Sequence, residues 1–242
     1  MEDNVYESQK LLSEYLLFHY GTAGEILPAS APAGMRDALD FAVRTQSHFT
    51  TPSERGLDLG CAVGRSSYEM SRTTRDEVIG IDFSQGFVNA AHIVRHGPLP
   101  YTRLDEAHVS TALEARLPNG IEASKVSFEQ GDAMNLRDDL GQFDRVHAAN
   151  LLCRLPEPDR LLERLPDLVI SGGELIITTP CTWLGEFTPP ENWPPGPTLD
   201  WLSDKLAGAF ELTLTHDEPF LIRETARKFQ WTSSQLSLWS RR

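Results

Sequence analysis

The chain is poor in cysteine, and this scarcity excludes proteins built on disulfides or on zinc–cysteine sites. It has three cysteines in 242 residues. The number is odd and the spacing is not that of metal ligands, so we expect reduced thiols and no bound metal. A chain of this length can bury a substantial core and fits one α/β domain over residues 1–242.

Basic residues and long apolar runs are also scarce. Lysine and arginine total 22 against 35 aspartates and glutamates, a formal net charge of −13, which disfavours a nucleic-acid partner. No apolar run approaches the roughly 20 residues that cross a bilayer. The opening MEDNVYESQK lacks the basic start and apolar stretch of a secretory signal. We therefore expect a cytoplasmic protein without a membrane partner, either a monomer or a homodimer.

Short apolar runs alternate with helical stretches after about residue 55, as in a parallel sheet covered by helices. Five strands are expected, at 56–60, 77–82, 126–130, 144–150 and 174–180. The later segments FELTLTH and SQLSLWS alternate apolar with polar residues, which predicts an antiparallel pair. The expected fold class is α/β, a doubly wound, mostly parallel seven-stranded sheet with an antiparallel C-terminal strand.

Three segments lie outside this alternation. Residues 5–21 carry apolar side chains at helical spacing and predict a helix that ends at Gly21 and lies across the functional edge of the sheet. We therefore expect a helical cap over residues 1–50 and a core over 53–242. The proline-rich stretch 188–201 predicts a loop. Residues 95–125 predict an insertion with one helix.

The stretch RGLDLGCAVGRSS (55–67) indicates where a ligand binds, because a doubly wound sheet binds ligands beyond the carboxyl ends of its strands. Gly60 and Gly64 give G-x-x-x-G, whereas a dinucleotide fingerprint needs glycine in place of Ala62 and Arg65. A turn without the pyrophosphate pattern suits S-adenosylmethionine, whose amino acid end meets the amides at the start of the next helix.

Acidic residues after the next two strands support this interpretation. Asp82 is expected to accept the ribose hydroxyls, and Asp132 the adenine amine. Phe83 would lie against the adenine, and Asp58 would orient the turn or meet the cofactor's ammonium. In the alternative reading Asp82 is a helix N-cap and Asp132 a turn residue. The predicted cofactor residues are Asp58, Gly60, Cys61, Ala62, Gly64, Asp82, Phe83, Asp132, Ala133 and Asn150.

These residues resemble the class I S-adenosylmethionine-dependent methyltransferases, which are Rossmann-like, over about residues 53–240. Three stretches outside the cofactor core resemble a narrower family, the 4-mercaptohistidine N1-methyltransferases of ovothiol biosynthesis. They are YESQKLLSEYLLFHYG (6–21), PCTWLGEFTPPENW (180–193) and RETARKFQW (223–231). Members occur alone or fused behind an iron-dependent sulfoxide synthase, and this chain resembles the standalone form.

The resemblance implies methylation of a ring nitrogen of 5-thiohistidine, a small-molecule substrate, to form ovothiol A. S-adenosylhomocysteine is the implied second product, and a separate sulfoxide synthase is the implied functional partner. The core departs from the family pattern at Ala62, where many members have glycine. Alanine permits a tight turn if its φ is negative.

The substrate side has polar candidates. Methyl transfer to a ring nitrogen needs alignment more than a base, because effective molarity outweighs general-base help. Arg223 and Arg227 would share a helical face and bind the substrate carboxylate, or form a solvated basic face with Lys228. The side-chain oxygen of Asn150 would accept a hydrogen bond from the ring N–H, or Asn150 is simply a turn residue.

The remaining candidates are aromatic residues, cysteines and side chains of the first helix. Trp183 and Phe187 would stack on the imidazole or pack in the core. Glu7 would accept the substrate ammonium or a proton, so Asn150 and Glu7 are the predicted catalytic residues. The first helix would close the site with Tyr6, Glu7, Tyr15, His19 and Tyr20, His19 being expected to be structural. Three cysteines follow predicted strands: Cys61, Cys153 and Cys181. They are expected to be small apolar fillers of the core, or one of them forms a mixed disulfide with a thiol-bearing substrate.

Overall fold

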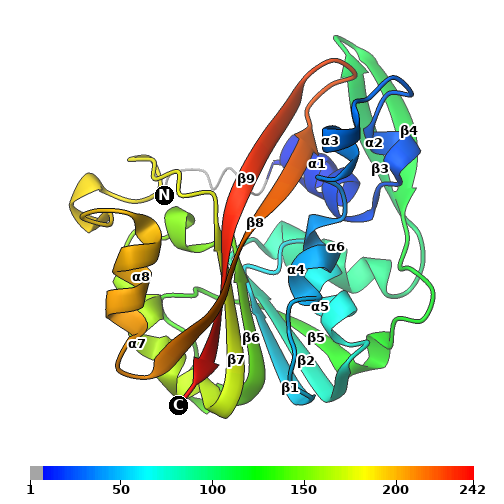
Figure 1. The fold of residues 1–242 in the computed structure, drawn as a ribbon. Coiled ribbons are helices and arrows are strands. Elements are labelled where there is room, and N and C mark those ends of the chain that lie inside the picture. Colours follow the sequence, from blue (N-terminus) through cyan, green and yellow to red (C-terminus); the bar gives the residue numbers. More distant parts are fainter. Residues whose placement is uncertain (1–7) are drawn as a thin grey trace.

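The central sheet has the strand order β5-β2-β1-β6-β7-β9-β8 in the computed structural model, which describes residues 8–242. Its strands are β1 (Ser53–Leu59), β2 (Thr74–Asp82), β5 (Val126–Gln130), β6 (Phe143–Ala149), β7 (Val169–Thr179), β8 (Phe210–Arg223) and β9 (Phe229–Arg241). The first five strands in that order run parallel, and β9 is antiparallel to both of its neighbours. The predicted fold class is confirmed, including the antiparallel pair at the end of the sheet (Figure 1).

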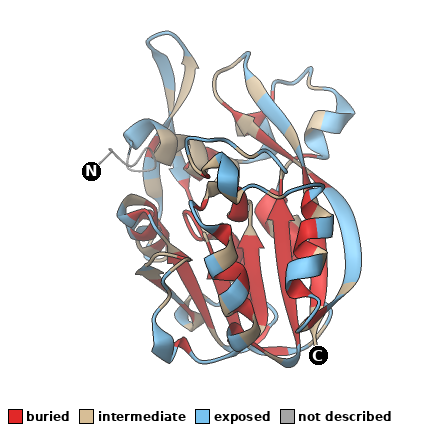
Figure 2. Ribbon diagram, turned by 90° about the vertical axis from the view of Figure 1, so that its left-hand side faces the viewer, coloured by how far each residue is buried: buried red, intermediate tan, exposed pale blue. Residues whose placement is uncertain are grey.

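Helices cover both faces of this sheet, and each face has its own apolar core (Figure 2). They are α4 (Phe41–Gln46), α5 (Arg65–Met70) and α6 (Gln85–Val94) on one face, and α7 (Pro158–Leu168) and α8 (Thr198–Leu206) on the other. Because β1 lies inside the sheet between β2 and β6, both of its faces are buried, with Leu57 and Leu59 fully inaccessible on one face and Asp58 1% exposed on the other. In α7 the fully buried Leu161, Leu165 and Leu168 repeat at helical spacing.

A cap of N-terminal helices stands at the carboxyl ends of the strands. It contains α1 (Gln9–Tyr20), α2 (Ala23–Ile26) and α3 (Ala33–Arg36). Ser8 caps α1, since its hydroxyl accepts the Leu11 N–H at 3.3 Å. Gly21 ends α1, where a Cβ would come within 2.5 Å of the Leu17 carbonyl oxygen. The predicted N-terminal helix and its end are confirmed. No helix of the described residues combines the length and apolarity that a bilayer crossing requires.

The insertion is a β-hairpin, and the expectation of a helix within residues 95–125 is wrong apart from the 3₁₀ turn Ala123–Lys125. Its strands are β3 (Leu99–Glu106) and β4 (Val109–Ala115), which pair antiparallel. Tyr101 pairs directly with Leu113, and the buried Tyr101 belongs to the core that includes α1. Strand formation is favoured because Leu99, Tyr101 and Leu113 pack against the same core as α1. Figure 1 shows the hairpin beside the N-terminal helices.

The proline-rich stretch 188–201 is only partly a loop. A 3₁₀ turn spans Pro190–Asn192, and α8 begins at Thr198 immediately after Pro197. Proline disrupts the interior of a helix because it has no backbone N–H to donate. It is tolerated just before the first turn, where a backbone N–H would have no partner within the helix. The buried Trp201 and Leu202 then dock α8 on the sheet.

Candidate functional site

The turn after β1 is left-handed at three of five consecutive residues. The backbone φ is 70° at Gly60, 48° at Ala62 and 86° at Gly64. Gly64 admits no side chain, because a Cβ would lie 2.6 Å from the Phe128 ring and 2.9 Å from Ala91 Cβ. The condition of a negative φ at Ala62, under which alanine would fit without strain, is not met. The turn holds alanine in a conformation that costs about 1–2 kcal/mol relative to glycine.

Asp82 explains why Ala62 is held in that conformation. Its Oδ2 accepts the Ala62 N–H at 2.8 Å, and its Oδ1 accepts the Ser84 N–H at 2.9 Å. The N-cap of α6 is Ser84, whose hydroxyl accepts the Phe87 N–H, so the reading of Asp82 as an N-cap is wrong. A half-buried carboxylate is thus fixed against the turn at the tip of β2.

Asp132 lies two residues beyond the end of β5, whose last residue, Gln130, pairs with Asp82 at the end of β2. The Oδ1 atom of Asp132 accepts the Met134 N–H at 2.8 Å, so Asp132 does shape its own turn. Ala133, the next residue, is buried. Phe83 follows Asp82 with 60% of its surface exposed. A carboxylate and an exposed aromatic ring are the chemistry expected of an adenosyl site.

Asp58 orients the start of α5. Its Oδ2 accepts the hydroxyls of Ser66 and Ser67, each at 2.6 Å, and its Oδ1 lies 2.8 Å from His147 Nδ1. Asp58 is 1% exposed. The first of its two predicted roles therefore agrees with the structure, whereas contact with a cofactor ammonium does not, since protein donors surround the buried carboxylate.

His147 continues this network and was not among the predicted residues. It is fully buried in β6, and its Nε2 lies 3.1 Å from the Thr45 hydroxyl of α4. The chain of contacts runs from α4 through His147 and Asp58 to α5. Its members are up to 102 positions apart, so no local pattern could have signalled it.

Asn150 lies at the tip of β6, as predicted, but its side-chain oxygen is occupied. That Oδ1 accepts the hydroxyls of Thr178 at 3.0 Å and Ser234 at 2.7 Å. The predicted bond from this oxygen to a substrate ring N–H is therefore wrong. The Nδ2 amide is the group that Asn150 retains for a ligand, and it is a donor. The φ of 53° also confirms the turn reading.

The cap contacts the turn through α1. The Tyr20 hydroxyl donates to the Val63 carbonyl at 2.8 Å, and Arg65 donates to the His19 carbonyl at 3.1 Å. The Tyr15 ring stacks on His19 at 5.9 Å between centroids. Residues 8–20 thus close the edge as expected, while Tyr6 and Glu7 lie outside the described residues.

The ring of His19 is neutral at neutral pH. Burial, with a smaller contribution from the Arg65 guanidinium, lowers the pKa of His19 to about 3. Its Nδ1 is shielded from solvent and has no hydrogen-bond partner among residues 8–242. His19 therefore provides no cation for a substrate carboxylate.

The aromatic residues after β7 pack against protein. Trp183 donates from Nε1 to the Thr198 hydroxyl at 3.1 Å and meets the Trp201 ring edge-on. The Arg154 guanidinium lies 4.5 Å from the centre of the Phe187 ring. The packing alternative is therefore the better account of Trp183 and Phe187.

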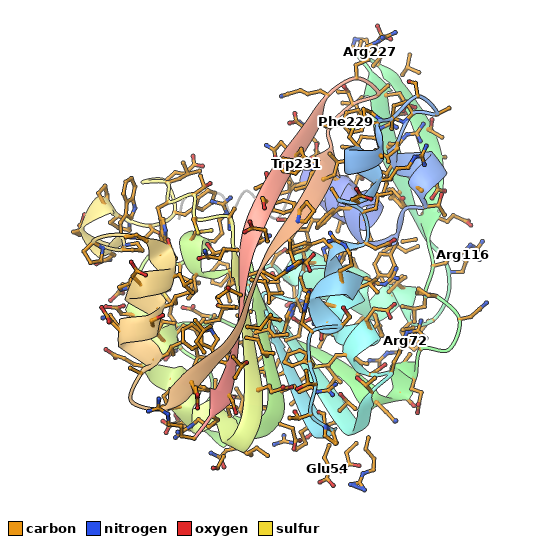
Figure 3. All side chains as sticks on the ribbon, in the orientation of Figure 1. Glu54, Arg72, Arg116, Arg227, Phe229 and Trp231 are labelled. Atoms are coloured by element: carbon orange, nitrogen blue, oxygen red, sulfur yellow. The ribbon has the colours of Figure 1, made fainter. Side chains whose placement is uncertain are left out.

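The two arginines do not share a helical face, because residues 224–228 form the turn between β8 and β9. Arg223 is 8% exposed and donates to Asp105 at 2.7 Å and to the Ile26 carbonyl at 2.9 Å. Arg227 is exposed at the tip of the ribbon (Figure 3). Buried Arg223 is committed to the cap, so the predicted carboxylate clamp is wrong.

The three cysteines follow β1, β6 and β7 as predicted, but their surroundings differ. Cys61 and Cys153 are buried, and burial raises the pKa of both thiols. Cys181 is exposed, with φ 53°. Cys61 and Cys153 are apolar fillers, and Cys181 is the accessible thiol.

A hollow of about 560 Å³ lies at the opposite ends of the strands and does not belong to this site. Its lining includes Glu54, Arg75 and Lys125. The three cations that line it are already paired, Arg72 with Glu69, Arg75 with Glu54 and Lys125 with Glu122. The chemistry expected from the sequence gathers at the carboxyl ends instead.

A family model described as a methyltransferase domain matches residues 30–231. Among curated proteins, tocopherol O-methyltransferase of Arabidopsis thaliana is 24% identical over 147 residues, which are 61% of this chain and 36% of that protein. The matched region spans only about a third of the length of the curated relatives.

Solved structures share the fold at low identity. The N-methyltransferase NodS from Bradyrhizobium japonicum, solved with S-adenosyl-L-homocysteine, has a TM-score of 0.54 and 12% identity, covering 95% of this chain and 98% of its own. The [4+2]-cyclase SpnF has a TM-score of 0.54 and 16% identity, covering 96% of each chain. Likeness at this level shows the fold and leaves the reaction open.

Proposed function

The chain belongs to the methyltransferase-domain family, and from that premise we propose that it transfers a methyl group from S-adenosylmethionine to an imidazole nitrogen of 5-thiohistidine, forming ovothiol A. The observation that carries the cofactor half of this proposal is the contact between Asp82 and the Ala62 N–H. It sets a carboxylate against a glycine-rich turn at the edge where this fold binds ligands.

The residues present fit such a cofactor. Asp82 and Asp132 are hydrogen-bond acceptors at the tips of adjacent strands, suited to hydroxyls and to an exocyclic amine. Phe83 offers an exposed ring next to Asp82. The Asp58 network orders the start of α5, whose first amides have no partner within the helix and suit a carboxylate.

The thiohistidine half is supported by the resemblance of three stretches outside the family core. Residues 9–20 form α1 over the cofactor turn, residues 180–193 follow β7 at the same edge, and residues 223–231 turn the β8–β9 ribbon. A separate sulfoxide synthase that supplies the thiohistidine remains part of this proposal.

S-adenosylmethionine, when bound, supplies an activated methyl group. The chain would align the acceptor nitrogen with that methyl, and good alignment is worth up to roughly 7–11 kcal/mol. The Nδ2 of Asn150 would donate to an acceptor on the ligand, since its oxygen is held by Thr178 and Ser234. The cap over the turn would exclude water. The nitrogen lone pair is the nucleophile, so no base is required.

A second candidate is a protein that binds S-adenosylmethionine without transferring its methyl, or that methylates another histidine-like molecule. It is favoured by SpnF, whose fold covers 96% of this chain although SpnF is a [4+2]-cyclase. Protein sequences of this fold can therefore serve other chemistry.

Product analysis distinguishes these candidates. The purified protein is incubated with S-adenosylmethionine and 5-thiohistidine, with histidine as the matched substrate that lacks the thiol. We expect S-adenosylhomocysteine and thiohistidine with one added methyl, identified by mass spectrometry and NMR. Cofactor binding in calorimetry without product from either substrate would favour the second candidate. Turnover of histidine alone would refute the thiohistidine assignment.

A further inference from the structure

Two histidines and a glutamate converge away from the cofactor turn. His48 follows α4 by two residues, while His216 and Glu218 lie two apart in β8 and so face the same side of that strand. His48 Nε2 is 2.6 Å from Glu218 Oε1, and His216 Nε2 is 3.7 Å from the same oxygen. One ligand atom from each residue lies within 4.8 Å of the others.

The carboxylate is held in place before any ion arrives. Only 4% of the Glu218 side chain is exposed. Arg44 donates to its second oxygen, Oε2, and also to the Leu39 carbonyl at 2.9 Å and to the Pro219 carbonyl. These bonds leave Oε1 directed between the two imidazoles. The His216 side chain is 54% exposed, which gives an ion access from solvent.

We propose that His48, His216 and Glu218 form a binding site for a divalent transition metal such as Zn²⁺. Two imidazole nitrogens and a carboxylate oxygen are donors that Zn²⁺ accepts, whereas Ca²⁺ and Mg²⁺ require mainly oxygen. Tetrahedral zinc, with bonds of about 2.0–2.1 Å, separates its ligands by about 3.3 Å. The distances of 2.6 and 3.7 Å lie on either side of that value, and the three ligand atoms lie within 4.8 Å of one another, so rotation of the imidazoles would bring them around an ion.

A bound ion would join two parts of the molecule. His48 is attached to α4, and β8 is the outermost strand of the sheet. The ion would therefore fasten α4 to the sheet edge, beside the existing contact between Arg44 and Glu218. Water would complete the coordination on the exposed side, because the protein contributes three ligands.

Calorimetry with Zn²⁺ alone tests the site, on tag-free protein stripped with a chelator, and Co²⁺ absorption reports the coordination. His216→Ala changes a largely exposed ligand, and His108→Ala is the matched control at an exposed histidine in the hairpin turn. We expect about one ion per chain and an affinity at least about tenfold weaker in His216→Ala, as even indirect changes at metal sites cost about 10- to 100-fold.

His48→Gln serves as a second ligand variant, and circular dichroism checks that each variant is folded. Three outcomes would each overturn the proposal. The affinity for Zn²⁺ could fall equally in His216→Ala and His108→Ala. It could be unchanged in a folded His216→Ala or His48→Gln, or the unmodified protein could fail to bind Zn²⁺. The last two outcomes would identify the cluster as a hydrogen-bonded ion pair around Glu218. None of these results depends on methyl transfer.

Discussion

Ala62 occupies left-handed backbone with φ 48°, and its N–H is bonded to Asp82. Ala62→Gly should remove a strain of about 1–2 kcal/mol from the folded state. The glycine also increases the conformational entropy of the unfolded chain, which lowers stability by about 0.4–1 kcal/mol. The two effects oppose each other, so we expect the free energy of unfolding, measured by urea titration, to rise by up to about 1.6 kcal/mol. The control Ala133→Gly, at a buried residue outside the left-handed region, should lower stability. Equal losses in both variants would contradict the strain at Ala62.

Asp82 provides the second prediction at the scale of one residue. Asp82→Asn keeps the shape and an acceptor oxygen but removes the charge, and hydrogen bonds to charged groups contribute about 1.5–3 kcal/mol. We expect the affinity for S-adenosylhomocysteine, measured by calorimetry, to fall about tenfold or more. Asp76→Asn, at an exposed position of the same strand, is the control and should bind normally. Matching affinities would remove Asp82 from the site.

At the scale of elements, His147 connects α4 to the start of α5. His147→Leu removes a partner from both Asp58 and Thr45 and leaves buried polar atoms short of bonds. Such losses cost about 1–3 kcal/mol each, so the free energy of unfolding should fall by at least that amount in urea titrations. The exposed control His96→Leu should change it by about 0.5 kcal/mol or less. If both variants match the unmodified protein, the network is not structural.

The β8–β9 ribbon, at the edge of the sheet, is bonded to the cap and to the hairpin. Arg223 in β8 donates to Asp105 in β3 and to the Ile26 carbonyl of α2. The Ala226 N–H adds a bond to the Asp105 carbonyl at 2.9 Å. Three segments that are far apart in the chain therefore meet at Arg223, which explains why Arg223 is buried rather than offered to substrate.

At the scale of the whole molecule, Asp105 should make stability depend on pH. The Arg103 hydrogen bond is the main cause that holds the pKa of Asp105 below its usual value, helped by Thr111 and by the charge of Arg223. A depressed folded pKa stabilises the protein above the unfolded pKa, about 3.9, and this contribution is lost as pH falls through the folded value.

The measurement compares thermal unfolding of the unmodified protein and Asp105→Asn between about pH 6 and pH 2.5. The difference in stability should be constant above about pH 5 and should shrink below about pH 4. Arg223→Gln removes one of the cations and should make that shrinkage smaller. A difference independent of pH would show that Asp105 acts without its charge.

Much of the fold follows from the sequence because its signals are local. Apolar runs bounded by turns predicted the five parallel strands and the antiparallel pair, and helical spacing with Gly21 predicted α1. The positions of Gly60, Gly64, Asp82 and Asp132 at strand tips follow from the same reasoning, since parallel strands end at one edge. The 95–125 hairpin was missed because its pairing face depends on packing against the cap.

The sequence by itself determined the strands, the turn after β1 and the acids beside it, because periodicity and turn chemistry act over a few residues. The tertiary structure alone decided which polar atoms are already paired. It gave Asn150 Oδ1 to Thr178 and Ser234, and it joined Asp58 to His147. It also brought His48 to Glu218, 170 positions away. Such pairings depend on long-range packing, which brings distant segments of the chain together and desolvates their side chains.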